Sequence, residues 1–330
     1  MKRIWRWLLL CTVLWMIGGC IIAPQVNLFK DASDPLEEFR LSGTEEGKVV
    51  VIPVEGMIST EGEDQMLRSK PSMVQEVVSQ LDLARADEEV GAVLLKINST
   101  GGSVTASDIL YSEIARFREE TGNTVVVALM NYAASGGYYI ALPADHILAH
   151  PTTVTGSVGV IYLRPTVHGL MDKIGVDVHA DKSGDFKDMG SFFRPSTEDE
   201  DLLFASMVDS LGERFMEKVW KHRDISDDVD AEIRSARIYL ADEALAAGMV
   251  DSVGYLPDAL REAKTLAGLH ENSKVVVYRR TRFANDNIYN PVTMRAGSEL
   301  PVSPETELVR QFARTAAGFY YLWLPGLENN

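Results

Sequence analysis

The stretch TVVVALMNYAASGGYY, residues 124–139, joins a strand-like apolar run to a turn of small residues and the start of a helix. A helix N-terminus leaves backbone N–H groups free, and these can point at a developing negative charge. The hydrolase elbow that holds a nucleophilic serine in this way reads G-x-S-x-G. Here Ala133 takes the place of its first glycine. The stretch therefore predicts either a nucleophile, Ser135, or a tight strand-to-helix turn without chemistry.

Short apolar runs like this one recur along the chain and alternate with helical stretches. Continuously apolar, β-branched runs are typical of strands that are covered on both faces. Their alternation with helices predicts βαβ units, a parallel sheet and an α/β fold class. The predicted strands are 49–54, 92–97, 124–130, 159–162 and 176–180, and the predicted helices are 73–85, 106–119, 165–174 and 197–222.

The predicted helix 197–222 carries one apolar stripe. Acidic residues at 198–200 suit the positive end of the helix dipole, and Ser196 or Thr197 can cap it. Large apolar residues recur every four positions along it: Leu203, Met207, Leu211, Phe215 and Val219. Such a stripe packs either into the core or against another subunit, and the sequence leaves both open.

The N-terminus has the pattern of an export signal. A basic start, residues 1–6, precedes an apolar core and the small-residue sequence Ile17-Gly18-Gly19-Cys20. That sequence resembles the bacterial lipobox, in which the cysteine is lipidated, so Cys20 is the predicted lipidation site. The alternative is an uncleaved membrane anchor, since the apolar stretch extends through Ala23 and approaches the roughly 20 residues that span a bilayer. Either way the body is expected in the bacterial cell envelope, outside the cytoplasm and tethered to a membrane.

Composition narrows the class of protein. The net charge of −16 argues against a nucleic-acid partner and against a polybasic membrane-binding surface. Cys11 and Cys20 are the only cysteines, so the exported body has no disulfide. Its stability must come from burial of a core, for which 330 residues with 46% hydrophobic content are sufficient.

The chain divides into four predicted parts. Residues 1–20 form the leader or anchor, and residues 21–47 form a polar tether. Residues 48–267 form one catalytic domain, because no internal repeat is present. Residues 268–330 form a C-terminal extension without an assigned role, ending in the aromatic sequence FYYLWL at 319–324.

Three further segments carry residues suited to catalysis. The first, NSTGGS at 98–103, has paired glycines whose backbone can approach a ligand closely. The N–H groups of Gly101 and Gly136 together are a candidate oxyanion hole. The second segment is TGSVG at 155–159, and the third is KSGDFKDMG at 182–190, which holds two lysines.

A serine nucleophile needs a base, and the six histidines lie in no recognisable triad pattern. Lysine can replace histidine when its ammonium group is desolvated, because burial lowers the pKa of an amine. Lysines in a loop are ordinarily solvated charges, so residues 182–190 alone do not identify a base.

Taken together in order and spacing, these segments resemble the signal peptide peptidase A family, also called protease IV, from about Gly47 to Ala267. The resemblance implies a ClpP/crotonase-like fold of repeated ββα units and a membrane-tethered serine endopeptidase that forms homo-oligomeric rings. It implies that Ser135 is the nucleophile, Lys187 the general base and Ser157 the hydroxyl that orients the lysine. Apolar peptides, above all signal peptides left in the membrane, are the implied substrates. The implied dyad needs no metal or cofactor.

One departure from the family pattern concerns the oxyanion loop. Thr100 stands where the family usually has proline before the paired glycines, so a looser loop is expected. Lys182 is the alternative base. Two other functions remain: a catalytically silent envelope scaffold, which the intact Ser135 and Lys187 disfavour, and an acyl-CoA enzyme, which the export signal disfavours.

Overall fold

The computed structural model describes residues 34–65, 68–293 and 317–324. The predicted leader, Cys20 and the first part of the predicted tether lie outside these residues. No helix among the described residues is long and apolar enough to cross a membrane.

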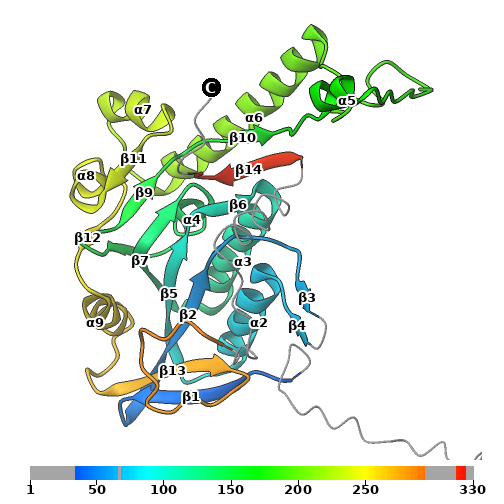
Figure 1. Ribbon diagram of the computed structural model, residues 1–330. Coiled ribbons are helices and arrows are strands. Elements are labelled where there is room, and N and C mark those ends of the chain that lie inside the picture. The colour runs from blue at the N-terminus through cyan, green and yellow to red at the C-terminus, as the bar shows by residue number, and fades with distance from the viewer. Residues whose placement is uncertain (1–33, 66–67, 294–316, 325–330) are drawn as a thin grey trace, which may run out of the picture. The chain divides into compact units, whose positions relative to one another are not determined.

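A mixed sheet, nine-stranded within the described residues, forms the centre of the fold (Figure 1). Its order is β1-β13-β2-β5-β7-β8-β12, with β9 paired to β7 and β11 paired to β9. All neighbours pair in parallel except β1 with β13 and β11 with β9, so the predicted parallel arrangement is confirmed. The strands are β1 Glu37–Ser42, β2 Glu45–Glu55, β5 Val90–Ser99, β7 Thr124–Ala134, β8 His146–Ala149, β9 Val154–Gly156, β11 Ile238–Leu240, β12 Ser252–Val253 and β13 Ser273–Arg279.

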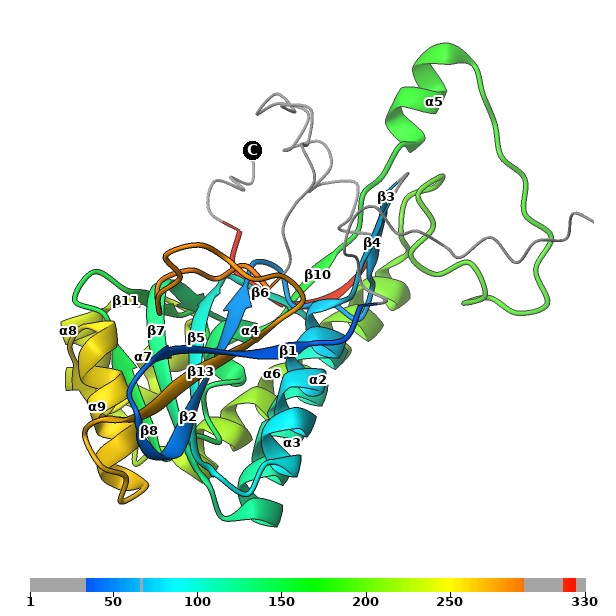
Figure 2. The same cartoon turned by 90° about the horizontal axis from the view of Figure 1, so that it is seen from below.

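Helices cover both faces of this sheet, which explains why its central strands are apolar throughout. Val50 and Ile52 pack on the face covered by α2 and α3, whereas Val49 and Val51 pack on the face covered by α9 (Figure 2). Successive residues of a strand point to opposite faces, so both sets must be apolar. The helices are α2 Met73–Ala86, α3 Val104–Thr121, α4 Gly136–Tyr139, α5 His168–Ile174, α6 Glu198–His222, α7 Asp227–Arg234, α8 Ala241–Ala246 and α9 Leu256–Leu266.

Two smaller sheets complete the described structure. Strands β3 (Glu63–Gln65) and β4 (Arg68–Lys70) pair with each other. Strands β10 (Ile161–Leu163), β14 (Gly318–Leu322) and β6 (Gly101–Ser103) form the other sheet, with β14 in the middle. This second sheet joins the end of the chain to the glycine-rich segment.

One predicted strand is wrong and one predicted helix is shorter than expected. Residues 176–180 form no strand: the helix before them ends at Gly175 in a left-handed conformation, and the chain beyond it is irregular. Val176 and Val178 are about half exposed, because no neighbouring strand pairs with this segment. The helix predicted at 165–174 begins only at His168.

Part of the predicted tether and part of the predicted C-terminal extension belong to the main sheet. Residues 37–42 form β1, which pairs with β13 of the predicted extension, and β13 pairs in turn with β2. Phe39 and Leu41 alternate along β1 and pack on the face covered by α9, which fixes this segment to the body. This edge of the sheet is therefore built from segments that are distant in the sequence.

His222, at the end of α6, gives the fold a pH dependence. Burial, aided by Lys221 and Arg223, lowers the pKa of His222 from 6.5 to about 4, and the ring contacts the Tyr111 hydroxyl at 2.7 Å. The unfolded chain therefore takes up this proton first, so the contribution of His222 to stability is present above pH 6.5 and is lost as the pH falls towards 4.

We expect His222→Gln, which cannot titrate, to flatten this loss. Between pH 7 and pH 4 the free energy of unfolding should fall by about 1 kcal/mol less in His222→Gln than in the unaltered protein, after allowance for partial solvent screening. Chemical denaturation at pH 7, 5.5 and 4 measures it. Parallel pH profiles for the two proteins would show that His222 does not carry the effect.

Candidate active site

Ser135 lies at the turn between β7 and α4 in a strained backbone conformation. Its φ of 52° and ψ of −116° are uncommon for a residue with a side chain. Three backbone hydrogen bonds maintain the turn: the Ser135 N–H donates to the Gly156 carbonyl at 2.7 Å, and the Tyr138 and Tyr139 N–H groups donate to the Ser135 carbonyl. The side chain is 1% exposed. The predicted strand-to-helix serine is thus held rigidly.

Ser157 belongs to the adjacent strand end. Strand β9 runs parallel to β7 with Gly156 opposite Ala134, so Ser135 and Ser157 follow neighbouring ends of the same sheet. Ser157 also has a positive φ, 49°, and its N–H donates to the Arg237 carbonyl at 2.8 Å. The Ser135 hydroxyl makes one long contact, 3.5 Å to the Gly159 carbonyl. The structure therefore brings the two predicted serines into one region.

Gly101 and Gly136 are also neighbours. A methyl group built on Gly101 would lie 2.8 Å from the Gly136 nitrogen and would clash with the Tyr321 carbonyl oxygen. Gly101 has a φ of +104°, and its N–H donates to the Ser99 hydroxyl at 3.1 Å. The two glycines thus border one corner beside Ser135, although in this state the Gly101 N–H is engaged by a side chain.

Lys187 lies on a long arm, residues 164–197, between β10 and α6. Figures 1 and 2 both show the α5 part of this arm projecting away from the main sheet. The Lys187 side chain is exposed, and the local bond of this residue is from its N–H to the Gly184 carbonyl at 3.1 Å. Within the described residues no hydrogen bond joins Lys187 to Ser135. A single chain therefore does not bring the predicted base and nucleophile into contact.

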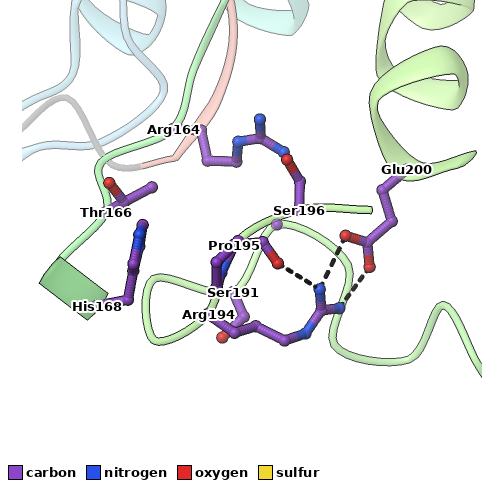
Figure 3. Close-up of a pocket in the computed structure, with 9 residues that line it drawn as sticks. Arg164, Thr166, His168, Ser191, Arg194, Pro195, Ser196 and Glu200 are labelled. Carbon is purple, nitrogen blue, oxygen red and sulfur yellow. Dashed lines mark hydrogen bonds and ion pairs between the residues drawn. The ribbon is translucent and has the colours of Figure 1, made fainter. Parts of the chain in front are cut away.

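The base of the arm is fixed by an ionic cluster. Asp188 pairs with Arg194 at 2.8 Å and with Lys182 at 2.7 Å. Arg194 also binds Glu200 in the first turn of α6, as Figure 3 shows. Hydrogen bonds from Arg194 and Lys182 hold the pKa of Asp188 well below its usual range. The Lys182 side chain is thus engaged by Asp188, which argues against this lysine as the base.

The sequence analysis did not predict strand β14, which lies beside Gly101 and Gly102. Strand β14 pairs with β6, Leu322 opposite Gly101 and Tyr321 opposite Gly102. The aromatic character of residues 319–324 was visible in the sequence, but a pairing with a segment more than 200 residues earlier leaves no local signal.

A buried, strained serine at a strand-to-helix turn, beside converging glycine backbones, is the arrangement of a serine hydrolase. Comparison with known proteins makes the class more specific. Residues 118–270 match the profile of peptidase family S49. The chain is 32% identical over 300 residues to a putative signal peptide peptidase SppA of Enterococcus faecium, covering 89% of this chain and 87% of that protein. The chain belongs to peptidase family S49 and is a serine protease of that family.

Other similarities are more partial. Protease 4 of Haemophilus influenzae is 29% identical over 255 residues, which span 77% of this chain but 40% of that longer protein. Among solved structures, a ClpP1 variant from Listeria monocytogenes superposes with a TM-score of 0.41 at 20% identity, over 64% of this chain and 94% of the other.

Proposed function

We propose that the chain is a membrane-tethered endopeptidase that cleaves apolar peptides through an acyl-enzyme on Ser135, with Lys187 as general base. The observation that carries the proposal is the conformation of Ser135, a strained residue that the surrounding hydrogen bonds hold next to two glycine backbones. The name of the Enterococcus faecium relative supports signal peptides as substrates. The leader supports membrane tethering in the bacterial envelope.

In this mechanism the Ser135 hydroxyl attacks the peptide carbonyl while neutral Lys187 accepts its proton. The Gly136 N–H, together with that of Gly101 once it has left the Ser99 hydroxyl, stabilises the oxyanion. Lys187 returns the proton to the leaving amine, and water then releases the acyl group. Ser157 orients the lysine amine.

Because Lys187 has no contact with Ser135 in its own chain, we propose that a neighbouring copy in a homo-oligomer supplies it. The arm presents uncovered apolar side chains, among them Leu170, Ile174 and Phe186, each more than half exposed. The first turns of α6 add Leu202, which is 64% exposed, whereas Phe215 and Val219 of the same helix are buried in the core. Exposed apolar surface of this kind favours a protein interface. Packing there would also supply the desolvation that a neutral lysine requires.

A serine-directed test comes first. A fluorophosphonate coupled to an apolar peptide should modify Ser135 of the full chain, with the adduct mapped by mass spectrometry, and the parent peptide should be hydrolysed. Ser99, equally buried but bound to the Gly101 backbone, is the internal control and should stay unmodified. A folded, assembled protein that neither reacts nor hydrolyses peptide would instead support a catalytically silent scaffold.

A further inference from the structure

Strand β7 contains a bulge just before the nucleophile turn. Two successive pairs join this part of the strand to β5: Ile97 with Leu129, and Ser99 with Ala133. Three residues of β7, 130–132, therefore lie opposite the single residue Asn98 of β5. A bulge of this kind bends its strand and redirects the residues that follow. It thus sets the direction in which the chain reaches Ser135.

The Asn98 side chain bridges this bulge to the neighbouring strand β2. The Tyr132 N–H donates to the Asn98 side-chain oxygen at 3.1 Å, and the Asn98 amide nitrogen donates to the Glu55 carboxylate at 2.9 Å. The Asn98 backbone is fixed as well, because its carbonyl accepts from the Gly56 N–H at 3.0 Å. An N–H group only donates and a carboxylate only accepts, so a side-chain amide can join the two.

Threonine hydroxyls hold the other side of the bulge, where β7 passes from β8 to β9 as its neighbour (Figure 1). The fully buried Thr153 hydroxyl lies 2.8 Å from the Leu129 carbonyl oxygen and 2.6 Å from the Met130 carbonyl oxygen. The Thr155 hydroxyl donates to the Ala133 carbonyl at 2.6 Å. Side chains thus hold the segment on both sides, at the point where the bulge interrupts the ladder of β5 and β7.

Glu55 is a firm anchor for the bridge. It is half-buried at the end of β2, and burial raises the pKa of its carboxyl, whereas the hydrogen bond from Asn98 and the charge of Lys96 favour the ionised form. Lys96 is 2% exposed, and its amine donates to the Ile288 and Tyr289 carbonyls at 3.1 and 2.9 Å. The end of the bridge away from the bulge is therefore fixed to the body of the fold.

We infer that Asn98 is a positioning residue for the nucleophile, because its side chain fixes the β7 bulge and thereby the place of the Ser135 hydroxyl. The inference rests on the proposed function for the role of Ser135. Asn98 acts through the Tyr132 backbone and touches no reacting atom. Without its side chain, the Tyr132 N–H can bond to water at the surface, since Tyr132 is 42% exposed. The bulge can then take other conformations, and Ser135 loses its fixed place.

Asn98→Ala tests the inference in the full-length protein. The kcat for a fluorogenic apolar peptide should fall about 10- to 100-fold with little change in KM, the effect of misplacing a reacting atom by about 1 Å. Modification of Ser135 by a small fluorophosphonate should slow by the same factor. Hydrogen exchange of residues 130–139, followed by mass spectrometry, should become faster, and this readout does not require catalysis.

An exchange of donor and acceptor gives the sharper test. Asn98→Asp alone sets two carboxylates against each other and should lose activity as Asn98→Ala does. Glu55→Gln alone keeps an oxygen that accepts from Asn98 and should keep most of its activity. The double variant, Asn98→Asp with Glu55→Gln, restores both hydrogen bonds and should recover kcat and slow exchange. These changes preserve side-chain volume, so they carry the test if Asn98→Ala does not fold.

Asp145→Ala is the matched control. The Asp145 carboxylate accepts from the Val125 N–H at 2.9 Å, at the other end of β7, and pairs with Arg118. This variant should lose stability but keep its kcat and the normal exchange of residues 130–139. Losses of kcat that follow melting temperature alike in all variants, or a double variant no better than Asn98→Asp, would overturn the inference. Activity in Ser135→Ala would instead refute the proposed function, and exchange alone would then decide whether Asn98 holds the bulge.

Discussion

Ser135→Ala and Lys187→Ala should each lower the rate of peptide hydrolysis by about 10⁴-fold or more. An equal mixture of the two variants, reassembled together, should recover activity. If one copy supplies the serine and its neighbour the lysine, random reassembly leaves both groups intact at about one quarter of the sites of a closed ring. The structure motivates this result because Lys187 is exposed and makes no hydrogen bond to Ser135 within the described residues of its own chain.

The measurement is hydrolysis of a fluorogenic apolar peptide after the two variants are dissociated, mixed and reassembled. Lys182→Ala is the matched control: it changes a lysine in the same loop that is bound to Asp188, and should keep most of its activity. A mixture that stays inactive after confirmed subunit exchange would place both groups in one chain. Partial activity in Lys187→Ala alone would move the base elsewhere.

The sequence predicted the central sheet well because its signal is local. Runs such as 92–97 and 124–130 are continuously apolar, and each lies within a central strand of the structure. The Ser135 turn was visible for the same reason, since a strand, small residues and a helix start follow one another directly. Strands β1 and β14 were not predicted, because each is defined by a partner far away in the sequence.

The position of Lys187 shows a different limit. Its segment is polar and glycine-containing, and next to it an ionic cluster joins Asp188 to Arg194 and Lys182. Such a cluster is not encoded in a local periodicity. The identity of the candidate base came from family resemblance, whereas the lack of a hydrogen bond between Lys187 and Ser135 within the described residues of one chain required the structure.

Gly101→Ala should reduce kcat/KM about 10²- to 10³-fold, the effect of losing an oxyanion contact. Gly101 has a φ of +104°, which strains any residue with a side chain, and the new methyl group would lie 2.8 Å from the Gly136 nitrogen. The backbone cannot retreat, because the Gly101 carbonyl accepts a hydrogen bond from Ile58 at 2.9 Å and Gly102 is packed against the same residue.

Gly122→Ala separates this blockage from backbone strain. Gly122 has a φ of +69° at the end of α3, and a methyl group built there meets nothing within 4 Å. Both variants should lose about 1 kcal/mol or more of stability from left-handed strain, but only Gly101→Ala should lose activity. Steady-state kinetics and melting temperatures of the two proteins measure this difference. Near-normal hydrolysis by Gly101→Ala would mean that the Gly101 backbone does not form part of the oxyanion hole.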